Sequence, residues 1–216
     1  MKDGLFLVLE GVEGAGKTTQ ARLLANWIGR LGLPVTSTRE PGGTAVGEAV
    51  RSVLLDHAEL EMSAETELLL VLAARAAFVR QVVRPALEKG GVLLADRFSL
   101  STLAYQGYGR GLDLERVRTL DAFARGGLAP DLTLVLELAP EEGARRQRAA
   151  GKGRDRMERA GEEFHTRVSD GYRELAAGSD ARVRAVDALG TPDAVQDRVR
   201  MALHEVFPGT FQLSRD

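Results

Sequence analysis

The sequence predicts a three-layer α/β fold, in which helices cover both faces of a five-stranded parallel sheet. Three observations lead to this prediction. Short apolar runs alternate with longer segments of helical spacing along the chain, as they do in parallel sheets. A glycine-rich loop at residues 11–18 follows the first apolar run and precedes the first helical segment. The 216 residues are enough for one sizeable core, so we expect a single domain over 1–216.

The elements follow in a regular order. The apolar runs that we expect to form strands are 5–9, 35–38, 92–95, 132–138 and 183–186. The segments that we expect to form helices are 17–30, 44–56, 64–88, 113–125, 140–149, 158–177 and 192–206. Thr44 is a candidate N-cap, Pro192 marks the start of the last helix, and Pro208 begins a tail over 208–216. Ligands in such sheets bind beyond the carboxyl ends of the strands.

Residues 11–18 have the pattern G-x-x-x-x-G-K-T of a phosphate-binding loop. Glycines let the backbone approach an anion, and the amides of the loop and of the helix N-terminus then point at its oxygens. Lys17 would bring a positive charge to the outer phosphates, and the Thr18 hydroxyl is placed to bind Mg²⁺. The residues that we expect to bind ATP are Gly11, Val12, Glu13, Gly14, Ala15, Gly16, Lys17, Thr18 and Thr19.

The composition argues against several other classes of protein. A net charge of -2 gives no reason to expect a nucleic-acid partner. No apolar run reaches the roughly 18 residues of a membrane span, and the first strand begins so close to Met1 that we expect no signal peptide. The absence of cysteine excludes disulfides, thiolate metal sites and a cysteine nucleophile. We therefore expect a cytoplasmic protein without a membrane partner.

The third expected strand ends in Asp96 and Arg97. A carboxylate at this edge suits Mg²⁺ or a water bound to it, and Arg97 can address a phosphate on the acceptor side. Hydrolytic ATPases with this loop commonly have a glutamate after the aspartate, which orients water. An arginine there favours transfer to a bound acceptor instead. The alternative is a salt bridge at the end of the strand.

Two further segments are candidates for substrate contact. The turn after the second strand, with Arg39 and Pro41, brings backbone near the ligand, although by itself it is equally a turn before a helix. Arg75 lies on an otherwise apolar helix, where a guanidinium needs a partner. A phosphate or a base carbonyl would provide one. The alternative is a buried ion pair with Glu65 or Glu67.

The segment 143–158 is predicted to be a mobile lid that closes over the triphosphate. It is basic and contains glycines between two expected helices, although a solvated helix face is the alternative. The basic residues in and beside it are Arg145, Arg146, Arg148, Lys152, Arg154, Arg156 and Arg159.

An acceptor that is itself a phosphate would explain this set of residues. A phosphate monoester has a second pKa of about 6, so at pH 7 it needs cations around it rather than a general base. The chain offers placed arginines and no convincing Ser/His/Asp set, which favours a nucleoside monophosphate kinase. A deoxynucleoside kinase, the alternative, would need Glu40 or Asp96 as a base. A GTP-binding switch would need the N-K-x-D motif, which the chain lacks.

Five segments occur in an order that carries a family resemblance. They are E-G-V-E-G-A-G-K-T-T at 10–19, T-R-E-P-G-G-T at 38–44, A-A-R at 73–75, D-R-F at 96–98 and S-T-L-A-Y-Q-G at 101–107. Together they resemble bacterial thymidylate kinases from about residue 4 to residue 206. The resemblance implies the P-loop NTPase fold and a homodimer that uses ATP and Mg²⁺ to convert dTMP to dTDP.

The same resemblance implies roles for residues at matching positions. Glu13 would accept a hydrogen bond from the deoxyribose 3′-hydroxyl, and Arg97 would hold the dTMP phosphate. Arg75 would reach the phosphate and a thymine carbonyl. Thr102 and Tyr105 would line the base and sugar, with the Tyr105 ring where a ribose 2′-hydroxyl would sit.

Two features concern family variation. The phosphate loop has no basic residue before Lys17, so the chain resembles members whose lid supplies the catalytic arginine; Arg156 fits best and Arg148 is the reserve. Val71 stands where the family usually has a phenylalanine that stacks on thymine. The absence of this ring would weaken binding of the base by on the order of 1 kcal/mol. We expect a neighbouring ring, Phe98, to compensate.

Overall fold

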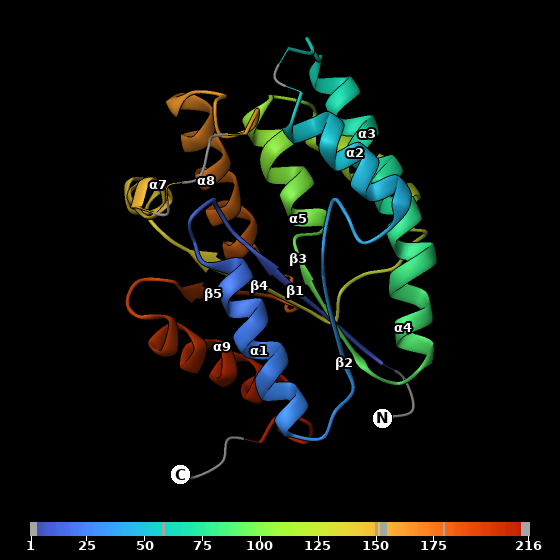
Figure 1. Cartoon of the computed structure of the whole chain (residues 1–216), viewed down its shortest axis with the longest axis vertical. Helices are drawn as coiled ribbons and strands as arrows, with labels where there is room; N and C mark the ends of the chain where they lie inside the picture. Colours follow the sequence, from blue (N-terminus) through green and yellow to red (C-terminus); the bar gives the residue numbers. More distant parts are fainter. Residues whose placement is uncertain (1–3, 58, 150, 152–154, 179, 213–216) are drawn as a thin grey trace.

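The computed structural model describes residues 4–57, 59–149, 151, 155–178 and 180–212. Its middle layer is a five-stranded sheet in the order β2-β3-β1-β4-β5, in which all pairs are parallel (Figure 1). The strands are β1 (Leu5–Glu10), β2 (Val35–Arg39), β3 (Val92–Asp96), β4 (Leu132–Glu137) and β5 (Val183–Asp187). Each lies within one residue of the expected range at either end, so the predicted strands and the predicted parallel sheet are confirmed.

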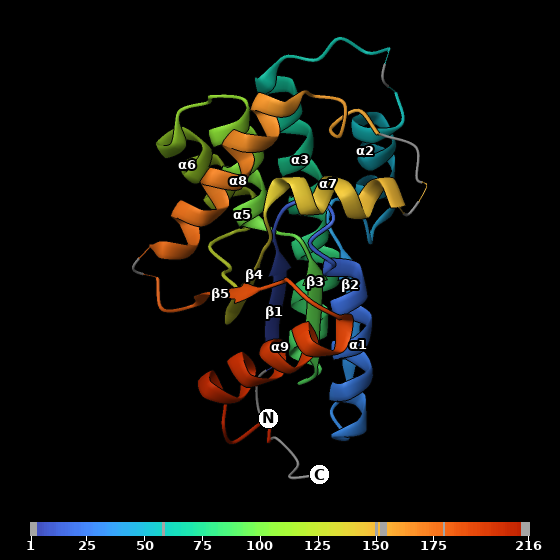
Figure 2. The same cartoon turned by 90° about the vertical axis from the view of Figure 1, so that its left-hand side faces the viewer.

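Helices cover both faces of this sheet (Figure 2). The α-helices among the described residues are α1 (Lys17–Arg30), α2 (Ala45–Leu55), α3 (Ala64–Phe78), α4 (Arg84–Glu88), α5 (Ser99–Thr102), α6 (Leu114–Ala124), α7 (Pro140–Ala149), α8 (Glu162–Ala177) and α9 (Pro192–Val206). In β1, Leu7 packs in a core with α1 and α9, whereas Phe6 faces the opposite core with Phe78. The side chains alternate because successive residues of a strand point to opposite faces.

The expected helix at 64–88 forms with one irregularity. Between α3 and α4 lies a π-helical segment, η1 (Val79–Val83). Pro85 is in the first turn of α4, and a proline can neither donate to the carbonyl four residues earlier nor fit against it. A π turn at that point relieves the conflict without ending the helix. The expected start of α8 at 158 is wrong, because Gly161, with φ 92°, interrupts the chain just before Glu162.

Residues 99–109 were not expected to be helical, yet they form α5 and the π-helical segment η2 (Leu103–Gly109). Two glycines in this stretch lower its helix propensity. They also permit close packing: a Cβ at Gly107 would lie 2.5 Å from Leu114, and one at Gly109 would lie 2.6 Å from Phe164. Tertiary contacts with α6 and α8 therefore stabilise a helix that propensity alone disfavours.

All five strands end on a charged residue at the same edge of the sheet; these residues are Glu10, Arg39, Asp96, Glu137 and Asp187. The turns after β1, β2 and β3 meet at this edge, and α7 lies across it in Figure 2. As predicted, Thr44 caps α2, where its hydroxyl accepts a hydrogen bond from Gly47 N. None of the helices in the described part of the chain is long and apolar enough to cross a membrane.

Candidate functional site

The loop between β1 and α1 has the backbone geometry of an anion cradle. Gly11, Gly14 and Gly16 all have positive φ, at 132°, 76° and 92°. A Cβ at Gly11 would lie 2.5 Å from the carbonyl oxygen of Leu136, so no other residue fits there without a shift. No side chain caps the N-terminus of α1, and its first turn has no acidic residue. Its first amides and its dipole are therefore free to act on an anion.

Lys17 folds back into this loop. Its Nζ donates to the carbonyl oxygens of Gly11 at 2.9 Å and Val12 at 2.8 Å. Burial, and next the positive charge of Arg97, lower the pKa of Lys17 from 10.5 to about 8. A phosphate in the loop would oppose both effects, because it would supply the negative charge that the buried ammonium lacks.

Arg97 reaches the same loop from the end of β3. Its φ of 78° is positive, which is unusual for a residue with a side chain and marks a position fixed by its surroundings. Its Nη1 donates to the carbonyl oxygen of Gly11 at 3.2 Å, so Lys17 and Arg97 bind one carbonyl oxygen between them. Its Nη2 donates to Glu13 at 3.0 Å and to the Tyr105 hydroxyl at 3.1 Å. Arg97 is thus in a salt bridge at the end of the strand, as the alternative held, and its partner is Glu13.

Glu13 lies between these cations. It accepts hydrogen bonds from Arg97 and from the hydroxyl of Tyr105. Burial acts to raise the pKa of Glu13, but the charges of Arg97 and Lys17 and the Tyr105 bond outweigh it, and the pKa falls below its usual value. Glu13 is therefore an ionised acceptor, ready to receive a hydrogen bond from a ligand hydroxyl.

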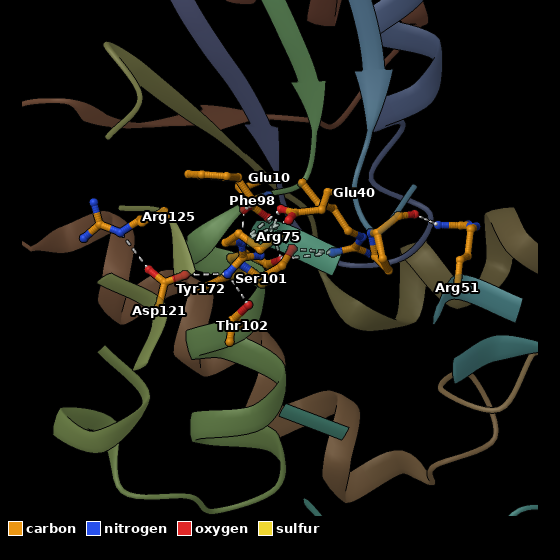
Figure 3. A network of polar contacts seen from close by, with 12 residues as sticks. Glu10, Glu40, Arg51, Arg75, Phe98, Ser101, Thr102, Asp121, Arg125 and Tyr172 are labelled. Carbon is orange, nitrogen blue, oxygen red and sulfur yellow. Dashed lines mark hydrogen bonds and ion pairs between the residues drawn. The ribbon is translucent and has the colours of Figure 1, made fainter. Parts of the chain in front are cut away.

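Arg75 is the centre of a buried network (Figure 3). Its guanidinium donates to Glu40 through Nε and Nη2, and its Nη1 donates to Asp121 at 2.6 Å. The sequence analysis gave a buried ion pair with Glu65 or Glu67 as the alternative. Arg75 is indeed in a buried ion pair, but neither of these residues is its partner. Both carboxylates come from distant parts of the chain: Glu40 lies in the turn after β2 and Asp121 lies on α6.

Burial and the neighbouring charges together set the pKa values of the residues in this network. Burial lowers the pKa of Arg75, but Glu40 and Asp121 raise it further, so the guanidinium stays charged. Burial raises the pKa of Glu40 to about 7 in spite of Arg75. Asp121 also accepts a bond from Arg125, so two arginines share the two carboxylates.

Three residues expected beside the base lie deeper than a contact surface. Thr102 is fully buried, and its hydroxyl accepts a bond from Arg75 Nη1 at 2.7 Å. Val71 packs among Val50, Leu54 and Ala74. Phe98 is 1% exposed, with its ring under the Arg75 guanidinium and edge-on to Phe6. Phe98 cannot stack on a base from behind Arg75, so the expectation that it compensates for Val71 is wrong.

Thr18 and Asp96 meet beside the phosphate loop. The Thr18 hydroxyl donates to Asp96 Oδ2 at 2.8 Å. A hydroxyl and a carboxylate are suitable oxygen ligands for Mg²⁺ or for its waters. The described residues include no cluster of three or more His, Cys, Asp or Glu that could hold a metal alone. This donor set fits a magnesium ion that takes its other ligands from substrate phosphates and water.

Arg51, which the sequence analysis did not single out, lies beside the turn after β2. Arg51 of α2 donates through Nη1 to the carbonyl oxygen of Pro41 at 3.1 Å. Burial, and next the charge of Arg39, lower the pKa of Arg51, and Arg97 contributes in the same direction. Arg39 itself is 55% exposed and pairs with Glu48. Spacing alone placed Arg51 on an ordinary helix surface, and no signal in the sequence distinguished it.

The described part of the segment 143–158 contacts two regions. In α7, Gly143 lies on the phosphate loop, where a Cβ would be 2.5 Å from Glu13 O. Arg156 points instead to α3 and α2, with Nη2 donating to Glu67 at 2.6 Å and Nε to Leu54 O at 2.7 Å. Arg148 is exposed on α7. Lys152 and Arg154 lie outside the described residues.

A cleft of about 310 Å³ opens between β4, α7, α8 and the loop after β5. Val12 of the phosphate loop and Tyr172 of α8 are among its lining residues, and neither Arg75 nor Arg97 is. The cleft therefore adjoins the phosphate loop, and Tyr172, whose hydroxyl accepts a hydrogen bond from Arg97, forms part of its wall.

Comparisons with known proteins agree with this geometry. A family model described as thymidylate kinase matches residues 9–199. The thymidylate kinase of Pelotomaculum thermopropionicum is 47% identical over 203 residues, which cover 94% of each chain. That of Pseudomonas putida is 50% identical over 194 residues, 89% of this chain and 91% of the other. The crystal structure of thymidylate kinase from Ehrlichia chaffeensis matches with a TM-score of 0.74 at 29% identity, covering 93% of this chain and 98% of that one.

Proposed function

Because the chain belongs to the thymidylate kinase family, we propose that the polar cluster at the carboxyl edge of its sheet is where it transfers the γ-phosphoryl group of ATP to dTMP. One observation carries this assignment: Lys17 and Arg97, from different elements, bind the same Gly11 carbonyl oxygen. Two like charges gathered at one point favour the binding of anions, and Glu13 offsets only part of their positive charge. A donor phosphate at Lys17 and an acceptor phosphate at Arg97 would satisfy both and bring the reacting groups together.

On the donor side we propose that the backbone of residues 11–19 holds the ATP phosphates. The amides of the loop, the N-terminus of α1 and Lys17 would spread the charge of the γ-phosphoryl group as it leaves. Thr18 and Asp96 would hold Mg²⁺, which when bound neutralises charge on the phosphate oxygens. No general base is required, because the acceptor phosphate is already ionised at neutral pH.

On the acceptor side we propose that Arg97 holds the dTMP phosphate, with Arg39 and Arg51 adding positive charge and Pro41 forming the adjoining turn. Glu13 would accept the 3′-hydroxyl of the sugar, beside the Tyr105 ring. Arg97 pairs with Glu13 in the structure, so dTMP would exchange this salt bridge for a phosphate and a hydroxyl.

For the base we propose a site formed around Arg75, whose guanidinium is held by Glu40, Asp121 and Thr102. Arg75 would reach the phosphate and a thymine carbonyl only by adding to or exchanging these bonds. Val71 would support this site from the core behind it, without the stacking of a ring. This network also disfavours the deoxynucleoside kinase alternative, since Glu40 is engaged with Arg75 instead of standing free as a base.

We propose that 143–158 acts as a lid and that one of its arginines completes the donor site. For Arg156 to act on ATP, its bonds to Glu67 and Leu54 would have to break. Arg148 is exposed and gives up no such bonds. The geometry therefore favours Arg148, which reverses the order of preference drawn from the sequence.

The reaction is tested with a panel of nucleotides. We expect ADP formation to require dTMP and to be far weaker with dUMP, dCMP or dAMP, and weaker still with thymidine. The measurement is coupled ADP release with each acceptor at equal concentration. ADP formation with thymidine equal to that with dTMP would assign a deoxynucleoside kinase instead, and formation with dTMP no greater than with water alone would refute the assignment.

The buried Lys17 gives ATP use a pH dependence. Its pKa of about 8 means that the charged form of Lys17 is lost as the pH rises through 8. Bound ATP keeps the ammonium charged, so we expect kcat/KM for ATP to fall above pH 8 while kcat at saturating ATP changes less. Lys17→Arg is the control, because a guanidinium stays charged and its profile should be flat there. A flat wild-type profile across this range would contradict the role of Lys17.

We also propose that the chain forms a homodimer through α3 and α6. These helices contact each other and carry the exposed apolar residues Leu69, Leu120 and Phe123, of which Phe123 is 86% exposed. We expect Phe123→Glu to give a monomer by size-exclusion chromatography with light scattering. Met201→Glu, at an exposed site on α9, should leave the dimer intact. A wild-type chain that is monomeric at micromolar concentration would contradict the proposal.

We propose a cytoplasmic location without nucleic-acid or membrane partners. The support is compositional: a net charge of -2 and the absence of cysteine.

A further inference from the structure

Glu10, the last residue of β1, is a fully buried carboxylate just before the phosphate loop. Its Oε1 accepts hydrogen bonds from Phe98 N at 2.7 Å and Ser101 N at 3.1 Å. Its Oε2 accepts from the Ser101 hydroxyl at 2.6 Å and the Tyr172 hydroxyl at 2.9 Å (Figure 3). All four of these groups donate to Glu10, an arrangement that matches a carboxylate, whose oxygens act only as acceptors.

The same two hydroxyls face Arg97 on their other side. Arg97 Nη1 donates to the Ser101 hydroxyl at 3.1 Å and to the Tyr172 hydroxyl at 3.0 Å. Each hydroxyl has one proton, which it can give to Glu10, and lone pairs, which accept from the guanidinium. The charge of Glu10 therefore acts on Arg97 through two hydroxyl groups, and no proton is left without an acceptor.

The two edges of the Arg97 guanidinium thus differ. The Nη1 edge is held by hydroxyls that belong to α5 and α8 and, at a longer distance, by the Gly11 carbonyl oxygen. The Nη2 edge contacts Glu13 and Tyr105, which line the proposed substrate site.

We propose that Tyr172, together with Ser101 and Glu10, is a positioning residue that fixes the Nη1 edge of Arg97 and so aims its Nη2 edge at the acceptor phosphate. This inference rests on the proposed role of Arg97 in binding dTMP. Tyr172 lies on α8, the helix that follows the lid, so the same hydroxyl ties that helix to the acceptor side.

A purely structural role for Tyr172 makes a different prediction. Its ring is buried and lies edge-on to Tyr105, where a phenylalanine ring would fill the same volume. If packing were its whole function, Tyr172→Phe would change nothing that is specific to the phosphate of the substrate.

The experiment compares the dissociation constants of dTMP and thymidine by titration calorimetry. We expect Tyr172→Phe to weaken dTMP by roughly tenfold, as for one lost hydrogen bond to a charged group, while thymidine and ATP change less than about twofold. The melting temperature of the variant shows that it is folded. Tyr108→Phe is the matched control: it removes a hydroxyl that bonds to Glu174 of α8, away from Arg97, and should leave both constants unchanged.

Ser101→Ala is the second variant and keeps the test decisive if Tyr172→Phe is unstable. It should also weaken dTMP selectively, and the double variant should lose less than the product of the two effects, because both hydroxyls hold one guanidinium edge. Equal weakening of dTMP and thymidine by either variant, or no weakening, would overturn the inference. Arg97→Ala separates the two proposals: if it leaves dTMP binding intact, the role of Arg97 itself is wrong.

Discussion

Replacing Lys17 by alanine should reduce turnover by about a hundredfold to a thousandfold, the loss expected when one preorganised charge is removed from the site of charge development. The ammonium lies inside the loop, on the Gly11 and Val12 carbonyl oxygens, and would transfer to the phosphates when ATP enters. No other lysine in the described residues is placed to take over this role. Coupled ADP release with saturating dTMP measures the effect.

The loss of turnover in Lys17→Ala should not be accompanied by a lower melting temperature. The pKa of Lys17 is lower in the folded protein than in an unfolded chain, so its charged form opposes folding at pH 7. We therefore expect Lys17→Ala to melt no lower than the wild type. Lys89→Ala, at an exposed site just after α4, is the control and should keep full activity. A Lys17→Ala protein that retains more than about a tenth of its turnover would contradict the donor-side assignment.

Arg97→Ala should lower kcat/KM for dTMP by about a hundredfold or more, as for the loss of one partner of a buried charge pair. Alanine meets the same strain as arginine at φ 78°, so the substitution tests the guanidinium and not the backbone. Binding of ATP should weaken far less than binding of dTMP. Arg97→Lys should not restore activity. An ammonium has no two separate edges, so it cannot contact Glu13 and Tyr105 on one side and the Ser101 and Tyr172 hydroxyls on the other.

Arg80→Ala, which removes an exposed arginine on η1, is the matched control for Arg97 and should behave as the wild type. Loss of ATP and dTMP binding to the same extent in Arg97→Ala would mean that Arg97 serves the whole site and not the acceptor phosphate.

Those parts of the fold that depend on local pattern could be predicted from the sequence. The five strands are short apolar runs, and each extends only to a charged residue at the edge of the sheet. The helix over 99–109 could not be predicted, because its glycines disfavour helix in isolation and are required by contacts with α6 and α8. The start of α8 was misplaced because Gly161 interrupts a continuous helical pattern.

In the candidate site, too, features within one continuous segment could be predicted, whereas contacts between distant residues could not. The phosphate loop is one continuous segment, so its geometry followed from its residues. The partners of Arg75 lie 35 and 46 residues away, beyond what spacing along one helix can reveal. Phe98 was expected to compensate for Val71 as a neighbouring ring, but the positive φ of Arg97 belongs to a turn that sends the Phe98 ring into the core beneath Arg75.

The most direct measurement is the ratio of the dissociation constants of thymidine and dTMP in the wild type and in Arg97→Ala. That ratio isolates the phosphate of the acceptor, since the two ligands share the base and the sugar. If Arg97 holds this phosphate, the wild type should strongly prefer dTMP and the variant should lose at least about tenfold of that preference. An unchanged ratio would place the acceptor phosphate elsewhere and contradict the account.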